Sequence, residues 1–193
     1  MADEKETSVF GIEMFEVKDK TKTIIDSIWC SDYYIVAARE SAPSKKDVMT
    51  FAAKYDVKLP REYIAHVTGF FGSPYLEVKE EFWPRHKEFD VGPFWSFLYG
   101  LFVYAYSDEA PDWMNIKIAT EEFQAMGHKV IPILKIIGDA DVYCLNKKGE
   151  IQRYSHEEDT FEAFDGGFFD LLQYEFLELD ERRTKKKAEL AKK

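Results

Sequence analysis

Two carboxylates that lie two positions apart open a strongly patterned segment, GDADVYCLNKKGEIQRY, at residues 138–154. Apolar and polar residues alternate on both sides of a central Asn-Lys-Lys-Gly turn, which predicts a β-hairpin. Side chains two positions apart in a strand point to the same face, so Asp139 and Asp141 could share a divalent metal ion or a proton. The further ligands that a metal needs could come from the segment beyond the hairpin, which contains His156, Glu157, Glu158 and Asp159.

A simpler interpretation of the two aspartates is that they are turn residues. Asp favours turns because its carboxylate accepts hydrogen bonds from nearby backbone N–H groups, and Gly138 permits a tight turn. The sequence contains no Walker loop, dinucleotide fingerprint, nucleophile elbow or zinc-type His and Cys spacing. We therefore favour the turn and expect no catalytic residue, no metal and no cofactor. An enzyme that uses Asp139, Asp141 and His156 remains an alternative.

The charge of the chain is strongly acidic and unevenly distributed. Its 193 residues carry a net charge of −10, and 46% of them are hydrophobic, which predicts a globular domain. Residues 180–193 hold seven basic and three acidic side chains, so residues 1–179 carry about −14. Such a body repels nucleic-acid phosphates and favours basic protein partners, so we expect no nucleic-acid partner. Solubility alone is the other explanation of the acidity.

Nothing in the sequence suggests export or membrane insertion. The opening MADEKETS is polar and acidic, unlike a secretory signal, and no apolar run approaches the roughly 18 residues of a membrane span. Cys30 and Cys144 lack the close spacing of a disulfide framework, which favours two separate thiols. We therefore expect a cytoplasmic protein that does not contact membranes.

Helical periodicity is clearest in two parts of the chain, at residues 44–69 and just before the basic tail. The motif SKKD predicts a helix start, with Ser44 as the N-cap and Asp47 three residues later. A second short helix is predicted in KLPREYIAHVTGF, with Pro60 in its first turn and Gly69 near its end. A closing helix is predicted before the basic tail. Its apolar face contains Phe168, Leu171, Leu172, Phe176 and Leu179.

Further segments of the chain predict a central antiparallel sheet of about five to six strands. Candidate strands are 33–38, 75–80, 101–106, 115–119, 130–137 and the two arms of the hairpin. Segment 101–106 is apolar on both faces, as a central strand would be. Pro132 cannot donate a ladder hydrogen bond, so we expect a bulge there. Residues 9–17 could add a strand, and 23–29 could be helical or extended. Helices on either side of such a sheet predict an α+β fold.

Three segments in this order resemble the SUKH superfamily, in its Smi/Knr-like branch. SKKDVMTFAAKYDVKLPREYIAHVTGF is similar to the family's opening helix–LP-x-x-Y–helix. VIPILKIIGDADVYCLNKKGEIQRYSHEE is similar to its middle strands, and DTFEAFDGGFFDLL to its closing helix. The resemblance covers residues 41–179. It leaves out residues 1–40, and the segment 79–100 is longer and more aromatic than the family pattern.

The resemblance implies a protein-binding function without catalysis. Many bacterial members of the superfamily are similar to immunity proteins, which neutralise polymorphic toxins, often nucleases. We therefore expect an immunity-like α+β domain at 41–179, with an N-terminal extension at 1–40 packed on the same domain. Residues 180–193 would form a basic helical tail that is frayed and solvated. A regulatory scaffold that binds cellular proteins is the alternative among binding functions.

The predicted binding surface consists of two acidic segments, at 107–113 and 156–165. Exposed aromatic residues anchor interfaces, and neighbouring carboxylates select a basic partner, here a basic toxin domain. The predicted partner-binding residues are Asp108, Glu109, Asp112, Trp113, His156, Glu157, Glu158 and Asp159. Trp113 could instead lie in the core, because large aromatic side chains are usually buried. The same choice between core and interface is open for the aromatic segment 83–99.

Overall fold

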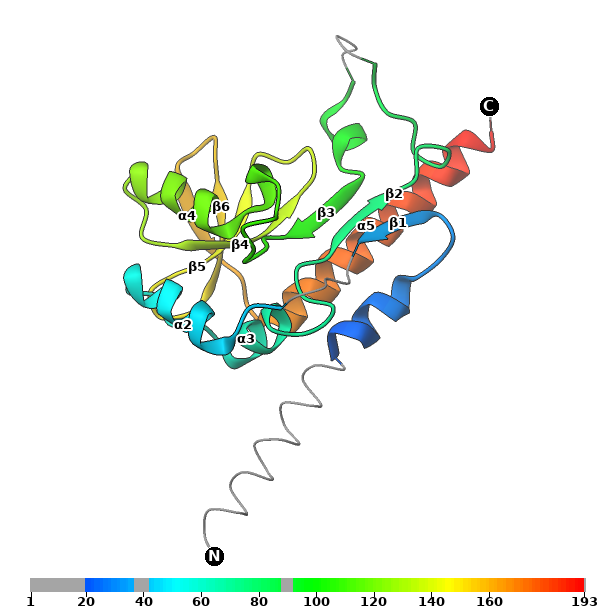
Figure 1. Ribbon diagram of the computed structural model, residues 1–193. Coiled ribbons are helices and arrows are strands. Elements are labelled where there is room, and N and C mark those ends of the chain that lie inside the picture. The colour runs from blue at the N-terminus through cyan, green and yellow to red at the C-terminus, as the bar shows by residue number, and fades with distance from the viewer. Residues whose placement is uncertain (1–19, 37–41, 88–91, 193) are drawn as a thin grey trace, which may run out of the picture.

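The computed structural model describes residues 20–36, 42–87 and 92–192. It has an α+β fold with a seven-stranded antiparallel sheet, one or two strands more than the sequence predicts (Figure 1). The candidate strand at 9–17 lies outside the described residues. Residues 20–28, where the sequence leaves a choice, form a helix that buries Ile24, Ile25 and Ile28 in the core.

Each strand of the sheet pairs with the next strand along the chain, in the order β1 to β7. The strands are β1 (Tyr33–Val36), β2 (Tyr75–Val78), β3 (Gly100–Val103), β4 (Ile131–Ile136), β5 (Val142–Leu145), β6 (Ile151–Ser155) and β7 (Thr160–Ala163). The predicted hairpin is formed by β5 and β6. The predicted irregularity at Pro132 is also confirmed, because the register between β4 and β5 shifts between Pro132 and Leu134.

Two predictions about local structure are wrong. Residues 115–119, predicted as a strand, begin the helix α4 (Ile116–Ala125), and the side chain of Asn115 caps it by accepting a hydrogen bond from the Lys117 amide. The acidic segment 156–165, for which the sequence predicts no strand, contains the edge strand β7, which pairs with β6. At 115–119 the cap at Asn115 favours a helix, and at 160–163 the pairing with β6 favours a strand, although the local composition suggests otherwise.

The predicted helices are present. The first pair is α2 (Lys45–Lys54) and α3 (Arg61–Val67), and Ser44 Oγ accepts a hydrogen bond from the Asp47 amide, as the capping motif predicts. Two short 3₁₀ helices, η1 (Phe94–Phe97) and η2 (Asp112–Met114), precede β3 and α4 respectively. The closing helix α5 (Phe168–Leu190) buries its predicted apolar face almost completely. None of the helices in the described ranges is long and apolar enough to cross a membrane.

The closing helix α5 crosses one face of the sheet (Figure 1). The Tyr33 hydroxyl on β1 donates to Asp180, and the Tyr143 hydroxyl on β5 donates to Glu175. The same face carries a row of buried apolar side chains from β2, β3 and β4: Leu76, Val78, Leu101, Val103, Leu134 and Ile136. This layer between α5 and the sheet is part of the hydrophobic core.

The helix α4 covers the other face of the sheet over the strands β4 to β6. Phe123 on α4 contacts Tyr154 on β6, with ring centroids 5.2 Å apart. Tyr154 belongs to a row of directly paired residues on this face, which also contains Tyr75, Phe102, Lys135 and Val142. Tyr75 and Phe102, at the β2 and β3 end of the row, lie beside α4 rather than under it, and a groove opens there.

The basic residues at 180–193, predicted as a frayed tail, continue the helix α5 as far as Leu190. Arg183 and Lys187 both contact the buried carboxylate of Asp32, which lies just before β1. These contacts connect the C-terminal half of α5 to the first strand of the sheet.

Candidate protein-binding groove

The two aspartates of the GDAD segment are turn residues with defined hydrogen-bond partners. Asp139 Oδ1 accepts from the Asp141 amide at 3.0 Å, and Asp141 Oδ1 accepts from the His156 amide at 3.1 Å. The other oxygen of each carboxylate contacts the guanidinium of Arg153, at 2.9 Å from Asp139 and 3.2 Å from Asp141. Gly138 makes the turn with φ +82°, and a Cβ there would lie 2.4 Å from the carbonyl oxygen of Phe97.

This arrangement uses the carboxylate oxygens that a metal or a transferred proton would need. The guanidinium of Arg153 contacts both carboxylates at once. Among the described residues, no group of three or more His, Cys, Asp or Glu side chains is placed to hold a metal ion. Both cysteines lie in the described ranges and are free thiols, with Cys144 buried in the core.

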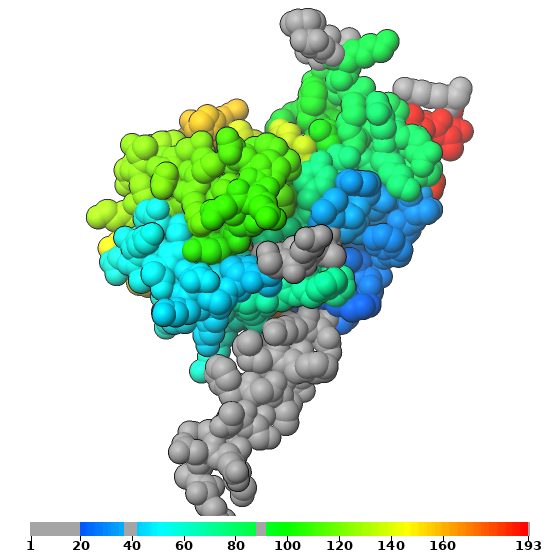
Figure 2. All heavy atoms as spheres, viewed as in Figure 1, coloured from blue at the N-terminus to red at the C-terminus, as the bar shows by residue number. Residues whose placement is uncertain are grey.

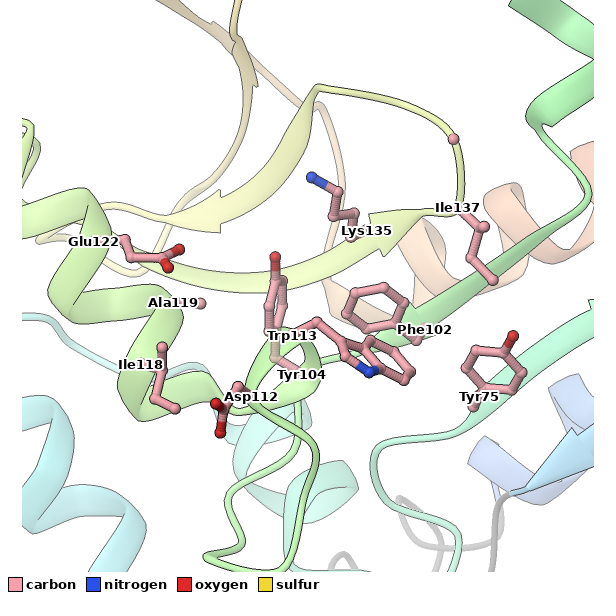
Figure 3. Close-up of a pocket in the computed structure, with 11 residues that line it drawn as sticks. Tyr75, Phe102, Tyr104, Asp112, Trp113, Ile118, Ala119, Glu122, Lys135 and Ile137 are labelled. Carbon is pink, nitrogen blue, oxygen red and sulfur yellow. The ribbon is translucent and has the colours of Figure 1, made fainter. Parts of the chain in front are cut away.

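A groove lies between α4, η2 and the strands β2 to β4, with a volume of about 690 Å³ (Figure 3). Its walls combine aromatic and aliphatic side chains with three charged groups. The lining residues are Tyr75, Phe102, Tyr104, Asp112, Trp113, Ile118, Ala119, Glu122, Lys135, Ile137 and Gly138. Two of the predicted partner-binding residues, Asp112 and Trp113, are among them.

One wall of the groove is a cluster of aromatic rings. Trp113 contacts Phe102 and Tyr75 edge-on, with centroids 5.1 and 5.8 Å apart. Its own side chain is still 56% exposed, whereas Phe102 is buried. Trp113 is therefore held in place on one side, and its other side faces the solvent. Its position is on the surface and not in the core.

The charged groups of the groove come from different elements. Asp112 is the first residue of η2, Glu122 lies on α4, and Lys135 lies opposite Phe102 in the β3–β4 register. Figure 3 shows the carboxylate of Glu122 directed toward Tyr104. Burial raises the pKa of the Tyr104 hydroxyl, and the negative charge of Glu122 raises it further, so this phenol stays neutral at physiological pH. Two carboxylates against one ammonium give the groove a negative balance.

Asp108 and Glu109 lie outside the groove, on the connection that leads to η2. Both are exposed, and Asp108 pairs with Lys117 at 2.6 Å. This hydrogen bond is the largest cause of the raised pKa of Lys117. The Asn115 side chain donates to the Ser107 carbonyl, which ties the connection to the start of α4. The acidic segment 107–113 is therefore attached to the helix that forms the groove.

In the second predicted segment, residues 156–159 form the turn between β6 and β7. His156, Glu157, Glu158 and Asp159 are all exposed there. Asp159 adopts a positive φ of 53° and accepts hydrogen bonds from Tyr154 and His128. None of the four lines the groove. The structure therefore brings Asp112 and Trp113 into one site and leaves His156 to Asp159 on a separate turn.

Several groove residues are absent from the predicted site: Tyr75, Phe102, Tyr104, Glu122 and Lys135. Glu122 is absent because the sequence predicts a strand where α4 begins. The signal that could have found it is the cap at Asn115, followed by Ile116, Ala119 and Phe123 at helical spacing. The strand residues could be recognised only by aligning β2, β3 and β4 in the correct register.

The aromatic segment 83–99 divides between core and surface. Trp83 is buried, and its indole N–H donates to the Ser96 carbonyl at 2.9 Å. Phe94 and Trp95, on η1, are both more than half exposed. Part of this segment therefore lies in the core and part of it lies on the surface.

Comparison of the chain with protein-family models, with curated proteins and with solved structures gives no match. The resemblance to the SUKH superfamily therefore stays a prediction, and the site must be interpreted from its own geometry.

Proposed function

We propose that this protein acts by binding another protein, without catalysis, as an immunity protein that neutralises a polymorphic nuclease toxin in the cytoplasm. The observation that carries the proposal is Trp113, an aromatic side chain that is fixed by Phe102 and Tyr75 yet exposes more than half of its surface at the rim of a groove. Fixed, exposed aromatic residues lose little entropy on binding and anchor many protein interfaces.

The charge around Trp113 supports a basic partner. Asp112 and Glu122 line the groove, Asp108 and Glu109 lie on the adjoining connection, and the whole chain carries −10. A toxin that binds nucleic acid needs a basic face, and an acidic surface complements it. The groove could accept a lysine or arginine side chain of that face, with its stem against the aromatic wall and its charge near Asp112 or Glu122.

The hydrogen bonding of Asp139 and Asp141 supports binding over the enzyme alternative. Their oxygens are occupied by Arg153 and by backbone amides. An enzyme at that position would need to break these contacts before its carboxylates could act. The resemblance to SUKH immunity proteins points in the same direction.

The proposal is tested by co-expression with each toxin encoded next to this gene. We expect growth rescue by the wild-type protein, loss of rescue by Trp113→Ala with Asp112→Lys, and retained rescue by Trp29→Ala. Trp29 is a suitable control because it is equally exposed but lies outside the groove lining. If none of the neighbouring toxins is neutralised, or if the groove variant protects as well as the wild type, the proposal is wrong.

A further inference from the structure

The last strand of the sheet, β7, has a free side. The strand order places β7 at the edge, where it pairs with β6, and no further strand follows it among the described residues. In Figures 1 and 2 the orange segment around residue 160 reaches the surface of the molecule. An exposed edge of a sheet offers backbone donors and acceptors to an extended chain that approaches it. This edge shares no residue with the groove of Trp113.

The pairing with β6 determines which backbone groups of β7 point outward. The amide of Phe164, directly after β7, donates to the Ile151 carbonyl at 2.9 Å. Backbone groups alternate in direction along an antiparallel strand, so those of Glu162 also face β6. The N–H and C=O groups of Phe161 and Ala163 therefore point away from the sheet. Each of these two residues leaves a donor and an acceptor outside the ladder.

The side chains of β7 leave this backbone accessible. Thr160, Glu162 and Ala163 are exposed, and Phe161 is half-buried. Ala163 carries only a methyl group, which cannot cover its own amide. β7 also lacks proline, the residue that removes a backbone donor from an edge. The edge can therefore accept a further strand without a change in its own conformation.

The helix α5 provides an apolar surface beside the edge. Glu162 and Phe164 point to the face of the sheet that α5 covers, and the ring of Phe164 lies 6.2 Å from that of Tyr174. Tyr174, and Leu177 one turn later on α5, are each about half exposed. A strand added to β7 could bury an apolar side chain against these two residues.

The edge is acidic. Arg153 lies opposite Glu162 on β6, but its guanidinium contacts the two aspartates of the GDAD segment. The turn 156–159, before β7, holds three exposed carboxylates, and the exposed Asp165 follows the strand. Opposite charges across a strand pair stabilise the pair, and like charges weaken it. A basic chain therefore suits this edge better than a neutral or an acidic one does.

A second copy of this protein is a poor occupant of the edge. If Phe161 of one copy paired with Ala163 of the other, Glu162 would lie directly opposite its own copy. In the same register the acidic turn 156–159 of each copy would lie near Asp165 of the other. Both contacts are repulsive, so the charge that suits a basic chain also opposes self-association.

We propose that β7 binds an extended basic segment of a protein partner, which adds to the seven-stranded sheet as a further strand and pairs with the backbone of Phe161 and Ala163. A lysine or arginine of the segment lies opposite Glu162, and an apolar residue two positions away packs on Tyr174 and Leu177. This spacing follows from the pleat, because alternate residues of a strand share a face. The proposal rests on the edge alone and does not require a toxin or the groove of Trp113.

A synthetic peptide, Thr-Lys-Thr-Val-Thr-Lys-Thr with both ends blocked, tests the proposal. Its lysines and its valine share one face, as the edge requires. Amide hydrogen exchange followed by NMR should slow at Phe161 and Ala163 at least about fivefold near saturation, since both amides become donors. The amide of Glu162, which already faces β6, should change less. The same peptide with Glu in place of Lys should bind at least about tenfold more weakly.

Ala163→Pro tests the outward backbone directly. It removes one outward donor and leaves the pairing with β6 in place, because the amide of Ala163 does not face β6. We expect it to weaken peptide binding at least about tenfold, through the lost donor and the bulk of the ring. Ala163→Val keeps the amide and is the matched control. A peptide N-methylated at its threonines makes the same test with the protein unchanged, and it should not bind.

Three results would overturn the proposal. The first is unchanged exchange at Phe161 and Ala163 at millimolar peptide, or equal binding of the peptide by Ala163→Pro and Ala163→Val. The second is concentration-dependent dimerisation that Ala163→Pro abolishes, which would make a second copy the occupant of the edge. The third is a perturbation confined to the Trp113 indole, which would place the peptide in the groove and leave the proposed function standing without this edge.

Discussion

The hydroxyl of Tyr143 donates a 2.6 Å hydrogen bond to Glu175 Oε1 and so joins β5 to α5 inside the core. Glu175 is only 2% exposed. Burial raises the pKa of its carboxyl, although the hydrogen bond from Tyr143 and the charges of Arg182 and Arg153 oppose the shift. A carboxyl group with a raised pKa makes the protein most stable when it is protonated, and this contribution is lost as the pH rises through its folded pKa.

Replacement of Glu175 by Gln should therefore increase stability at neutral pH. Gln keeps an acceptor for Tyr143 but carries no charge into the core, so we expect the free energy of unfolding to rise by about 1 kcal/mol at about pH 7. The gain should shrink as the pH falls toward the ordinary Glu pKa of about 4.3. Urea unfolding at several pH values measures this, with Glu121→Gln on the exposed side of α4 as a control. A gain that grows at acidic pH would contradict the assignment.

The buried carboxylate of Asp32 has the opposite pH dependence. Burial alone would raise its pKa, but hydrogen bonds from Lys187 and Arg183 outweigh it and lower the pKa below the usual value. Asp32 therefore stabilises the fold above the ordinary Asp pKa of about 3.9, and this contribution is lost as the pH falls through its folded pKa.

We expect Asp32→Asn to lower the free energy of unfolding by about 2 kcal/mol at neutral pH, because it leaves Arg183 and Lys187 without the negative charge that they share. The difference in unfolding free energy between this variant and the wild type should decrease at acidic pH. Asp26→Asn is the matched control, since its ion pair with Lys22 is more than half exposed on both sides and should contribute about 0.5 kcal/mol or less. Urea unfolding of both variants tests the pair; equal effects would contradict a structural role for Asp32.

The double change Asp139→Asn with Asp141→Asn tests the interpretation of these residues as a turn. Asn keeps oxygen acceptors for the two amides but loses the charge opposite Arg153, which is partly exposed. We expect a loss of stability of about 1 kcal/mol and unchanged partner binding. Elemental analysis of the wild-type protein and the variant gives an independent test: a stoichiometric metal that disappears in the variant would restore the enzyme alternative.

Association with the proposed toxin should depend steeply on salt. The Debye length falls from about 30 Å at 0.01 M to about 8 Å at 0.15 M, so we expect the on-rate to fall at least about tenfold over that range. Charge reversal at Asp108, Glu109 and Asp112 should slow association, and Trp113→Ala should mainly speed dissociation.

Stopped-flow mixing with the identified partner measures both rates. Reversal of Glu80 and Glu81 is the control, because these exposed acids lie outside the groove lining. If the on-rate is indifferent to salt, or if the control slows association as much as the groove variant does, the acidity serves solubility and the interface lies elsewhere.

The sequence predicts well those parts of the fold in which the signal lies within a single helix or strand. The apolar stripe from Phe168 to Leu179, the cap at Ser44 and the irregularity at Pro132 each appear as predicted. At α4 the pattern was ambiguous, because Ile116 and Ile118 alternate as in a strand while Asn115 caps a helix. β7 has the sequence TFEA with its side chains mostly exposed, so no hydrophobic alternation marks it.

The candidate site was predicted only at its rim. Asp112 and Trp113 stand out in a turn-rich acidic segment, whereas Phe102 and Lys135 become neighbours only through the β3–β4 register. A register is set by the whole sheet and cannot be derived from one strand.

The order of the strands along the sheet has a consequence for how the chain folds. Each strand pairs with its neighbour in sequence, so the sheet can form by short loop closures. The helix α5 follows all seven strands, and until it docks, the apolar side chains of β2, β3 and β4 on that face remain in water. A chain interrupted before Phe168 would form a nearly complete sheet with an exposed apolar face. Intermediates of this kind aggregate or bind chaperones. Docking of α5 therefore covers the apolar surface through which the folding protein could aggregate.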